Sequence, residues 1–245
     1  MRIAIVAEVF LPKVDGVVHR TVNLIRNLVA RGDDVVVICP EAANRGRTPA
    51  PVIEFPSFQC PSYPEYRIGV PDARLSAAVE SFAPDVLHYV NPFAFGFRCF
   101  DILDNSGVSI PSVFSFHTLY GEFVKSYRGL KPLSRTLWWL MRDYHNRADA
   151  NLTVSTITER ELHRRGFERL SVWPPAVDGE MFNPQHACPQ MRRRLSGGYP
   201  DEPLLLTVSR LAPEKNVALL ADVMDRMVID DVTDQPDERD IKERQ

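Results

Sequence analysis

The chain contains 245 residues, of which 44% are hydrophobic and 25% are charged, and its formal net charge is −3 at pH 7. These values are typical of an ordinary globular protein with one large or two small domains. The net charge gives no overall attraction to nucleic acid, so we expect no nucleic acid among its partners.

The first 39 residues predict a strand, a loop, a helix and a second strand. Short and β-branched apolar residues alternate over Arg2–Glu8, which predicts a buried strand. Apolar residues recur with helical spacing over Val17–Arg31, and Asp34–Cys39 is again a buried strand. The loop Phe10–Gly16 therefore lies at the carboxyl end of a strand, where open α/β sheets bind their ligands. Gly16 at the helix entrance could present backbone N–H groups to an anion, or it could be a plain structural turn.

The alternation of strands and helices continues to about residue 173. Further strands are predicted over Val52–Phe55, Val86–Val90, Ser112–Phe116, Ala150–Val154 and Leu170–Trp173. Helices are predicted over Pro71–Phe82, Phe93–Ser106, Pro132–Arg147 and Ile157–Arg165. The proline-rich stretch SFQCPSYPEYR is predicted as a loop. This pattern predicts an α/β fold with a Rossmann-like parallel sheet and helices on both of its faces.

The alternation of predicted strands and helices stops after Trp173, where a proline-rich stretch without periodicity begins. We predict a Rossmann-like domain over 1–173, a linker over 174–200, the start of a second domain over 201–227 and a charged, disordered tail over 228–245. The second domain would begin with a strand over Leu204–Val208 and a helix over Val217–Met227. One strand and one helix cannot bury a core of their own, so we expect this domain to be truncated.

Cysteine usage and apolar runs indicate the compartment. The cysteines Cys39, Cys60, Cys99 and Cys188 include no C-x-x-C pair, and the first and third lie in apolar segments, so we expect these two to be buried free thiols. The opening apolar run is broken by Glu8, and no run is long enough to span a bilayer, so we expect neither a signal peptide nor a membrane span. These features predict a cytoplasmic protein, and attachment to the inner face of the plasma membrane stays open.

Several polar residues follow the predicted strands and so fall at the ligand edge of the sheet. They are Asp15, Gly16, Asn91, His117, Thr118 and Ser155. His117 could donate to an anionic oxygen and stabilise developing charge, or it could be a supporting surface histidine. His88 lies within a strand and is predicted to be a satisfied core residue.

Two further groups have a functional and a plain interpretation. Arg210 and Lys215 precede the Val217 helix and could clamp a pyrophosphate, although spacing alone favours a solvated loop. Trp138 and Trp139, with nearby arginines, could touch a membrane, although a core with a solvated face is the favoured interpretation. No metal-binding or Walker A motif is present, and the missing G-x-G-x-x-G disfavours a dinucleotide oxidoreductase.

Together these residues resemble a known family. The segments MRIAIVAEVFLPKVDGVVHRTVNLIRNLVARGDDVVVICPE, FAPDVLHYVNP, IPSVFSFHT, ADANLTVS, AVDGEMFNP and LLLTVSRLAPEKN follow one another as in the amino-terminal, acceptor-side half of retaining GT-B glycosyltransferases of family four. The FLPKVDG and PSYPEYRIGVP stretches look closest to sulfoquinovosyl transferases and lipid mannosyltransferases. The resemblance implies sugar transfer from a nucleotide-sugar to a diacylglycerol or glycolipid acceptor, with no other cofactor.

The resemblance also implies residue roles. Gly16 would approach the donor phosphates, His117 would contact the donor sugar, and Arg210 and Lys215 would hold the pyrophosphate. Ala176 stands where the family usually has glycine, and no glutamate is followed by another eight positions later, as the family's donor domain requires. We therefore expect weak or no activity from this chain alone. The alternative is a non-catalytic acceptor-binding or membrane-docking module. Oligomeric state is not predicted.

Overall fold

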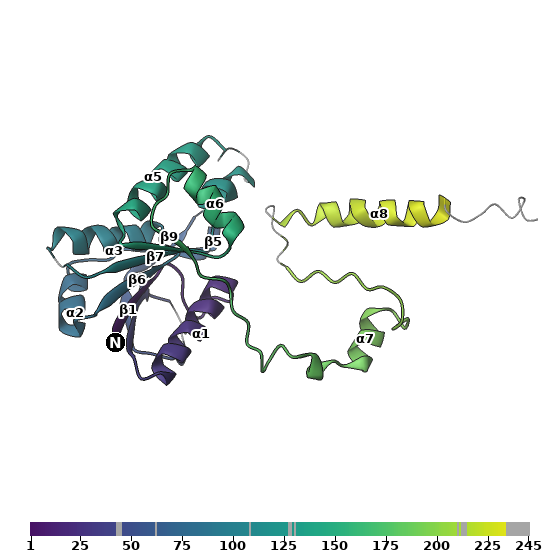
Figure 1. Ribbon diagram of the computed structural model, residues 1–245, viewed down its shortest axis with the longest axis horizontal. Coiled ribbons are helices and arrows are strands. Elements are labelled where there is room, and N and C mark those ends of the chain that lie inside the picture. Colours follow the sequence, from purple (N-terminus) through teal and green to yellow (C-terminus); the bar gives the residue numbers. More distant parts are fainter. Residues whose placement is uncertain are drawn as a thin grey trace, which may run out of the picture. The chain divides into compact units, whose positions relative to one another are not determined.

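The computed structural model describes residues 1–42, 46–61, 63–107, 109–126, 129, 131–209, 211 and 215–233 (Figure 1). The chain divides into two compact units. The first unit comprises Met1–Glu122 and Pro132–Asp178, and the second comprises Phe123–Lys131 and Gly179–Gln245.

A parallel sheet forms the centre of the first unit. Its strands lie in the order β3-β2-β1-β6-β7-β8-β9, and every neighbouring pair is parallel. Their bounds are β1 (Arg2–Ala7), β2 (Asp34–Pro40), β3 (Val52–Phe55), β6 (Val86–Val90), β7 (Ser112–Phe116), β8 (Ala150–Thr153) and β9 (Leu170–Val172). The helices between them are α1 (Gly16–Ala30), α2 (Arg74–Phe82), α3 (Ala94–Asn105), α4 (Tyr120–Phe123), α5 (Leu133–Arg147) and α6 (Thr156–Arg164).

Helices cover both faces of this sheet, and Figure 1 shows α1 on the opposite side from α3 and α5. Along β1, Ala4 and Val6 belong to one buried cluster, with residues of α2, α3, α5 and α6, whereas Ile3 and Ile5 belong to the other, with residues of α1. Side chains of a strand alternate between its two faces, so a strand buried on both faces must be apolar throughout. The structure confirms the predicted fold class and these predicted strands and helices.

The stretch that was predicted as a proline-rich loop is instead a hairpin. The strands β4 (Ser57–Cys60) and β5 (Tyr63–Gly69) pair antiparallel, with an irregular register between Gln59 and Cys60. Proline is tolerated in such a separate two-stranded ribbon because many of its N–H groups are not needed for a ladder. The hairpin ends against α3, since a Cβ on Gly69 would lie 2.4 Å from the Phe95 ring.

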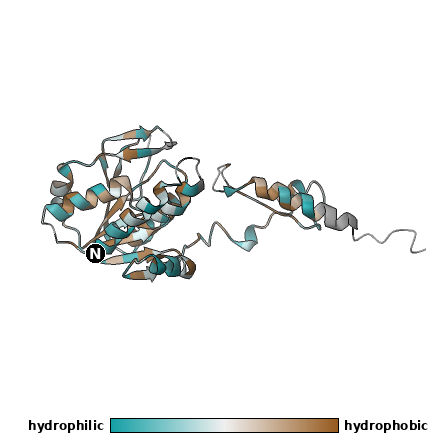
Figure 2. Ribbon diagram, turned by 90° about the horizontal axis from the view of Figure 1, so that it is seen from above, coloured by the Kyte–Doolittle hydropathy of each residue, from teal (hydrophilic) through white to brown (hydrophobic). Residues whose placement is uncertain are grey.

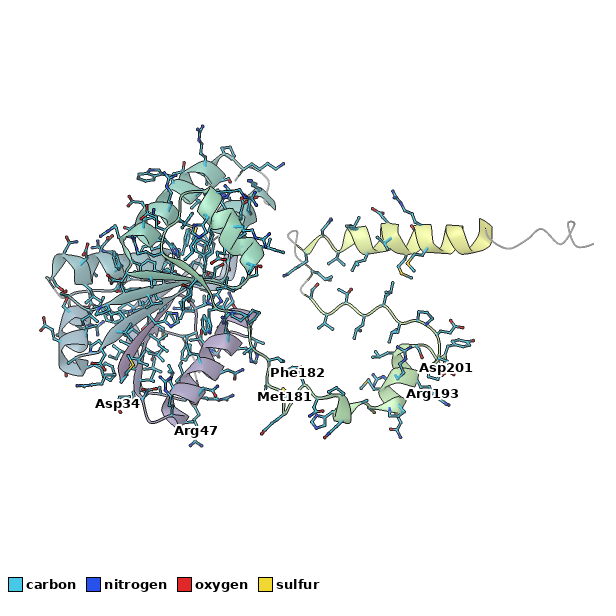
Figure 3. All side chains as sticks on the ribbon, in the orientation of Figure 1. Asp34, Arg47, Met181, Phe182, Arg193 and Asp201 are labelled. Carbon is cyan, nitrogen blue, oxygen red and sulfur yellow. The ribbon has the colours of Figure 1, made fainter. Side chains whose placement is uncertain are left out.

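The second unit contains little regular structure in its described residues. It holds the 3-10 turns η1 (Val124–Ser126) and η2 (Pro184–His186) and the helices α7 (Pro189–Leu195) and α8 (Ala218–Thr233). The helix α7 falls inside the predicted linker, where Met181 and Phe182 are also exposed, with fractional exposures of 66% and 67% (Figure 3).

Two sequence predictions for this unit were wrong. Leu204–Val208 forms no strand, and Leu205 and Val208 are exposed, because an isolated strand has no partner to satisfy its backbone. The helix α8 continues to Thr233, past the predicted end at Met227, and its first turns carry hydrophobic residues (Figure 2). Residues 234–245 of the predicted tail lie outside the described residues, and the boundaries of the four predicted segments stay predictions.

Two of the cysteines confirm their predicted role. Cys39 on β2 and Cys99 on α3 are both buried, with no measurable exposure. Burial raises the pKa of the Cys99 thiol well above its ordinary value, so this sulfur stays protonated and packs as a small apolar group.

Candidate functional site

The predicted ligand edge begins where α1 follows β1. Asp15 caps the helix, because its Oδ1 accepts a hydrogen bond of 2.9 Å from the Val18 N–H. Gly16 is the first residue of α1, its φ is not in the left-handed region, and no described atom lies within 4 Å of a Cβ placed on it. The fold itself therefore does not require glycine at this position. An N-terminal glycine that the fold does not need is compatible with close approach of a ligand.

Asn91 organises the next part of the edge. It follows β6 with a φ of 50° and is buried. Its Oδ1 accepts from the backbone N–H groups of His117 at 3.1 Å and Thr118 at 2.9 Å. Its Nδ2 donates to the Tyr120 hydroxyl at 2.7 Å and to Thr118 Oγ1 at 3.2 Å. The structure thus brings Asn91, His117 and Thr118 together, and the asparagine fixes the loop after β7.

The His117 imidazole is only partly accessible. Its Nε2 lies 3.1 Å from Ser115 Oγ, and its ring meets the Trp173 indole edge-on at 6.0 Å between centroids. Burial, the Arg20 charge and the nearby His88 lower the pKa of His117 to about 3. The ring is therefore neutral at pH 7, with one donor and one acceptor nitrogen. A neutral ring can donate a hydrogen bond to a ligand oxygen but does not bring a positive charge.

His88 on β6 is buried and hydrogen-bonded, as predicted. Its Nε2 lies 2.9 Å from Ser115 Oγ, and its ring also contacts Trp173 edge-on, at 5.8 Å. Burial, followed by the Arg20 charge, lowers the pKa of His88 to about 4. Sequence reasoning missed that the same serine joins His88 to His117, because the two histidines are 29 positions apart and only the β6–β7 register brings them together.

Glu8 is the other residue that sequence reasoning missed. Its side chain is 1% exposed, and its carboxylate accepts hydrogen bonds from the backbone N–H groups of Phe93, Phe95 and Gly96, at 2.8, 3.1 and 2.8 Å. It also accepts from the Tyr66 hydroxyl on β5. A carboxylate at the amino end of α3 is favoured by the helix dipole. The available signal was a lone charge directly after a buried strand.

Ser155, Arg210 and Lys215 are the remaining predicted site residues. Ser155 is a helix cap, since its Oγ accepts from the Thr158 N–H at 3.2 Å. Arg210 lies outside the described residues, and Lys215 belongs to the second unit. Their predicted contact with a pyrophosphate therefore stays a prediction. Among the described residues, no group of three or more histidine, cysteine or acidic side chains could hold a metal ion.

The family assignment follows from residues 14–180, which include the Asp15 cap, Asn91 and both histidines. This segment matches the model of Glycosyltransferase Family 4. The chain belongs to this family.

Curated relatives of this family-4 chain have related activities. A GDP-mannose-dependent alpha-mannosyltransferase of Mycolicibacterium smegmatis is 37% identical over 229 residues, which are 90% of this chain and 59% of the relative. The sulfoquinovosyl transferase SQD2 of Arabidopsis thaliana is 32% identical over 87% of this chain and 42% of its own length. An alpha-monoglucosyldiacylglycerol synthase of Acholeplasma laidlawii is 31% identical over 50% of this chain and 31% of that protein. The chain thus spans less than two thirds of each of these relatives.

A solved structure supports the fold of this family-4 chain. The sucrose-phosphate synthase of Thermosynechococcus elongatus superposes with a TM-score of 0.65 over 92% of this chain and 60% of its own, at 16% identity. At this identity the likeness concerns the fold alone, and it agrees with the parallel Rossmann-like sheet.

In the first unit, the adjacent residues Trp138 and Trp139 have different environments. Trp138 on α5 is buried, donates its Nε1–H to Glu122 at 3.2 Å and lies under the Arg165 guanidinium. Trp139 is 57% exposed, and Arg135 and Arg142 are exposed on the same helix. No helix among the described residues is long and apolar enough to cross a membrane.

Proposed function

We propose that this protein takes part in moving a sugar from a nucleotide-sugar donor to a lipid acceptor. The family match over residues 14–180 carries the proposal. Relatives named for GDP-mannose and for a glucosyldiacylglycerol product support, respectively, a nucleotide-sugar donor and a diacylglycerol or glycolipid acceptor. The nucleotide-sugar is a substrate, and the proposal requires no other cofactor.

The chemistry proposed for the first unit is positioning and hydrogen bonding. The amino end of α1 at Gly16 faces the donor phosphates, and the neutral His117 ring forms a hydrogen bond with the donor sugar through the ring nitrogen that does not face Ser115. Asn91 holds the backbone of His117 and Thr118, so the imidazole is fixed before the substrate arrives. Arg210 and Lys215 supply positive charge to the leaving diphosphate.

Access to a lipid acceptor is proposed through contact with the inner face of the plasma membrane. The exposed Trp139, flanked by the exposed Arg135 and Arg142, supports this contact, because an aromatic ring with nearby cations is favoured at an anionic membrane surface. The buried Trp138 takes no part in it.

The test measures transfer and membrane binding separately. The purified chain is incubated with vesicles that contain diacylglycerol and anionic lipid, and with labelled GDP-mannose, UDP-glucose or UDP-sulfoquinovose in turn. Because the chain alone is expected to be at most weakly active, we expect slow labelling of the lipid fraction with one donor, and loss of this labelling in His117→Ala. Vesicle binding without transfer from any donor would instead favour a non-catalytic acceptor-binding module. The absence of both vesicle binding and transfer would contradict both functions.

Co-sedimentation resolves the membrane contact. Trp139→Ala should weaken binding to anionic vesicles several-fold, since it removes an aromatic ring that enters the interface. Phe58→Ala is the matched control, because Phe58 is an exposed aromatic residue, 52% accessible, on the hairpin rather than on α5. Equal binding by both variants would contradict a docking role for α5.

A further inference from the structure

A single serine hydroxyl links the two imidazoles beneath the ligand edge. Ser115 Oγ lies 2.9 Å from His88 Nε2 and 3.1 Å from His117 Nε2. His88 comes from β6 and Ser115 from β7, and the parallel register of these strands places them side by side. Ser115 is 1% exposed, and the Trp173 indole lies against both rings. No bulk water can therefore replace either hydrogen bond at the serine.

The hydroxyl imposes a rule on the two rings. A serine has one proton to donate and two lone pairs to accept with. If the proton goes to one imidazole nitrogen, the other imidazole must donate its own N–H to the same oxygen. The remaining partner, the Tyr89 carbonyl at 3.5 Å, is too distant to compete for the proton. At most one of the two Nε2 atoms can therefore lack a hydrogen.

The distances favour one of the two arrangements. The shorter separation is on the His88 side, which favours donation of the hydroxyl proton to His88 Nε2. His117 Nε2 then carries hydrogen and donates to the serine over 3.1 Å, and His117 Nδ1 is left as an acceptor. Both rings are neutral at pH 7, because burial and the Arg20 charge lower their pKa values to about 4 and about 3. A neutral imidazole carries its single N–H hydrogen on either Nδ1 or Nε2. Because the two Nε2 atoms share the Ser115 hydroxyl, the tautomer of His88 and the tautomer of His117 are coupled.

We propose that His88 is a positioning residue which, through Ser115, sets the nitrogen of His117 that carries the proton. The inference rests on the proposed function only in assigning His117 to the substrate; the coupling itself is a property of the folded first unit. Its consequence is that the hydrogen-bonding character that His117 offers a ligand is decided by a residue that does not touch the ligand.

Nitrogen-15 NMR of histidine-labelled protein at pH 7 tests the coupling without requiring sugar transfer. In the wild type, the His117 signals, assigned by their loss in His117→Ala, should show a protonated Nε2 and an unprotonated Nδ1. In Ser115→Ala the bridge is absent, and the two ring signals should move toward each other as the tautomers average. In His88→Phe the hydroxyl loses its preferred acceptor, so the population with hydrogen on His117 Nδ1 should increase.

His88→Gln is the matched conservative variant. The amide oxygen of glutamine can accept the Ser115 proton as the imidazole does, so the wild-type His117 signals should be restored. Where transfer is measurable, His88→Phe should lower kcat by about tenfold with KM unchanged, less than the 10²- to 10⁴-fold typical of a lost proton-transfer group, and His88→Gln should recover it.

The outcomes separate the two claims. Unchanged His117 signals in both Ser115→Ala and His88→Phe would overturn the proposal. If the signals shift as expected but no donor supports transfer in any variant, the coupling stands and the proposed function fails. Since the serine variant removes only one buried oxygen, it tests the coupling even if the phenylalanine variant does not fold.

Discussion

The guanidinium of Arg20 lies 3.6 Å from the centre of the Trp173 indole ring. The same group donates hydrogen bonds to the carbonyls of Trp173 at 2.5 Å and Pro174 at 3.2 Å. This contact joins α1 to the chain that leaves β9. It also holds the indole in place against His88 and His117, so one arginine stabilises the cover of both imidazoles.

Arg20→Ala should destabilise the first unit by about 2 kcal/mol, because it removes a cation–π contact and two hydrogen bonds made by a charged group. For a domain of this size we expect a fall in Tm of about 4–8 °C. Arg26→Ala is the control, since Arg26 is exposed on the same helix and such surface changes alter stability by at most about 0.5 kcal/mol. Equal melting temperatures would show that the Trp173 contact contributes no stability.

Glu8→Gln should lower the free energy of unfolding by about 3 kcal/mol, which is more than Arg20→Ala. The amide turns one acceptor oxygen into a donor that faces backbone N–H groups of α3, so buried donors lose their partner. Tyr66→Phe removes only the hydroxyl group that is hydrogen-bonded to the same carboxylate, and we expect it to lower the free energy of unfolding by about 1 kcal/mol. Urea unfolding of the two variants measures both values. A glutamine variant no less stable than the phenylalanine variant would contradict the helix-capping role.

The pH dependence of stability should reveal the buried histidine. The folded-state pKa of His88, about 4, lies below its unfolded value near 6.5, since burial and then Arg20 disfavour the charged ring. The unfolded state therefore binds the extra proton first as pH falls. The stability contributed by the neutral ring is complete above pH 6.5 and is lost toward pH 4.

His88→Gln removes this titration while keeping a hydrogen-bonding group. Between pH 6.5 and pH 5.0 the wild type should lose about 1.5 kcal/mol more stability than the variant, because the full slope of about 1.36 kcal/mol per pH unit is reached only below pH 6.5. Urea unfolding at several pH values measures the difference. His186→Gln changes an exposed histidine and should follow the wild type. Parallel curves for wild type and His88→Gln would contradict a depressed pKa.

The spacing of apolar residues was sufficient to predict the parallel sheet from the sequence, because strands such as β1 are buried on both faces and strongly apolar. It also placed Asn91 and His117 at one edge, since both follow parallel strands. It failed where the outcome depends on distant partners. The prolines near Tyr66 suggested a loop, and the apolar run Leu204–Val208 suggested a strand that has no neighbour to pair with.

The missed site residues have the same explanation. The partners of Glu8 are 58 to 88 positions away, and those of Ser115 come from a neighbouring strand and from the residue that follows its own strand. Single-sequence patterns report local spacing, whereas these hydrogen bonds are created by the order of strands in the sheet. Buried polar residues need a partner, so a lone acid or serine in a predicted apolar strand indicates that such a partner exists without identifying it.

Gly16→Ala separates the two interpretations of the loop after β1. No described atom lies within 4 Å of the added methyl group, and the φ of Gly16 is not in the left-handed region, so the fold should tolerate alanine and gain about 0.5 kcal/mol. If donor phosphates approach this backbone, the same methyl group occupies their space, and donor affinity should fall at least about tenfold, or about 1.4 kcal/mol.

Calorimetric titration with GDP-mannose and thermal unfolding measure the two effects of Gly16→Ala on the same samples. Gly179→Ala is the control, because a Cβ on Gly179 also meets no described atom and its φ is not in the left-handed region, but it lies outside the loop after β1. Unchanged affinity in Gly16→Ala would identify the loop as a structural turn. Reduced affinity together with unchanged or increased Tm would indicate that glycine is needed at this helix entrance for the ligand rather than for the fold.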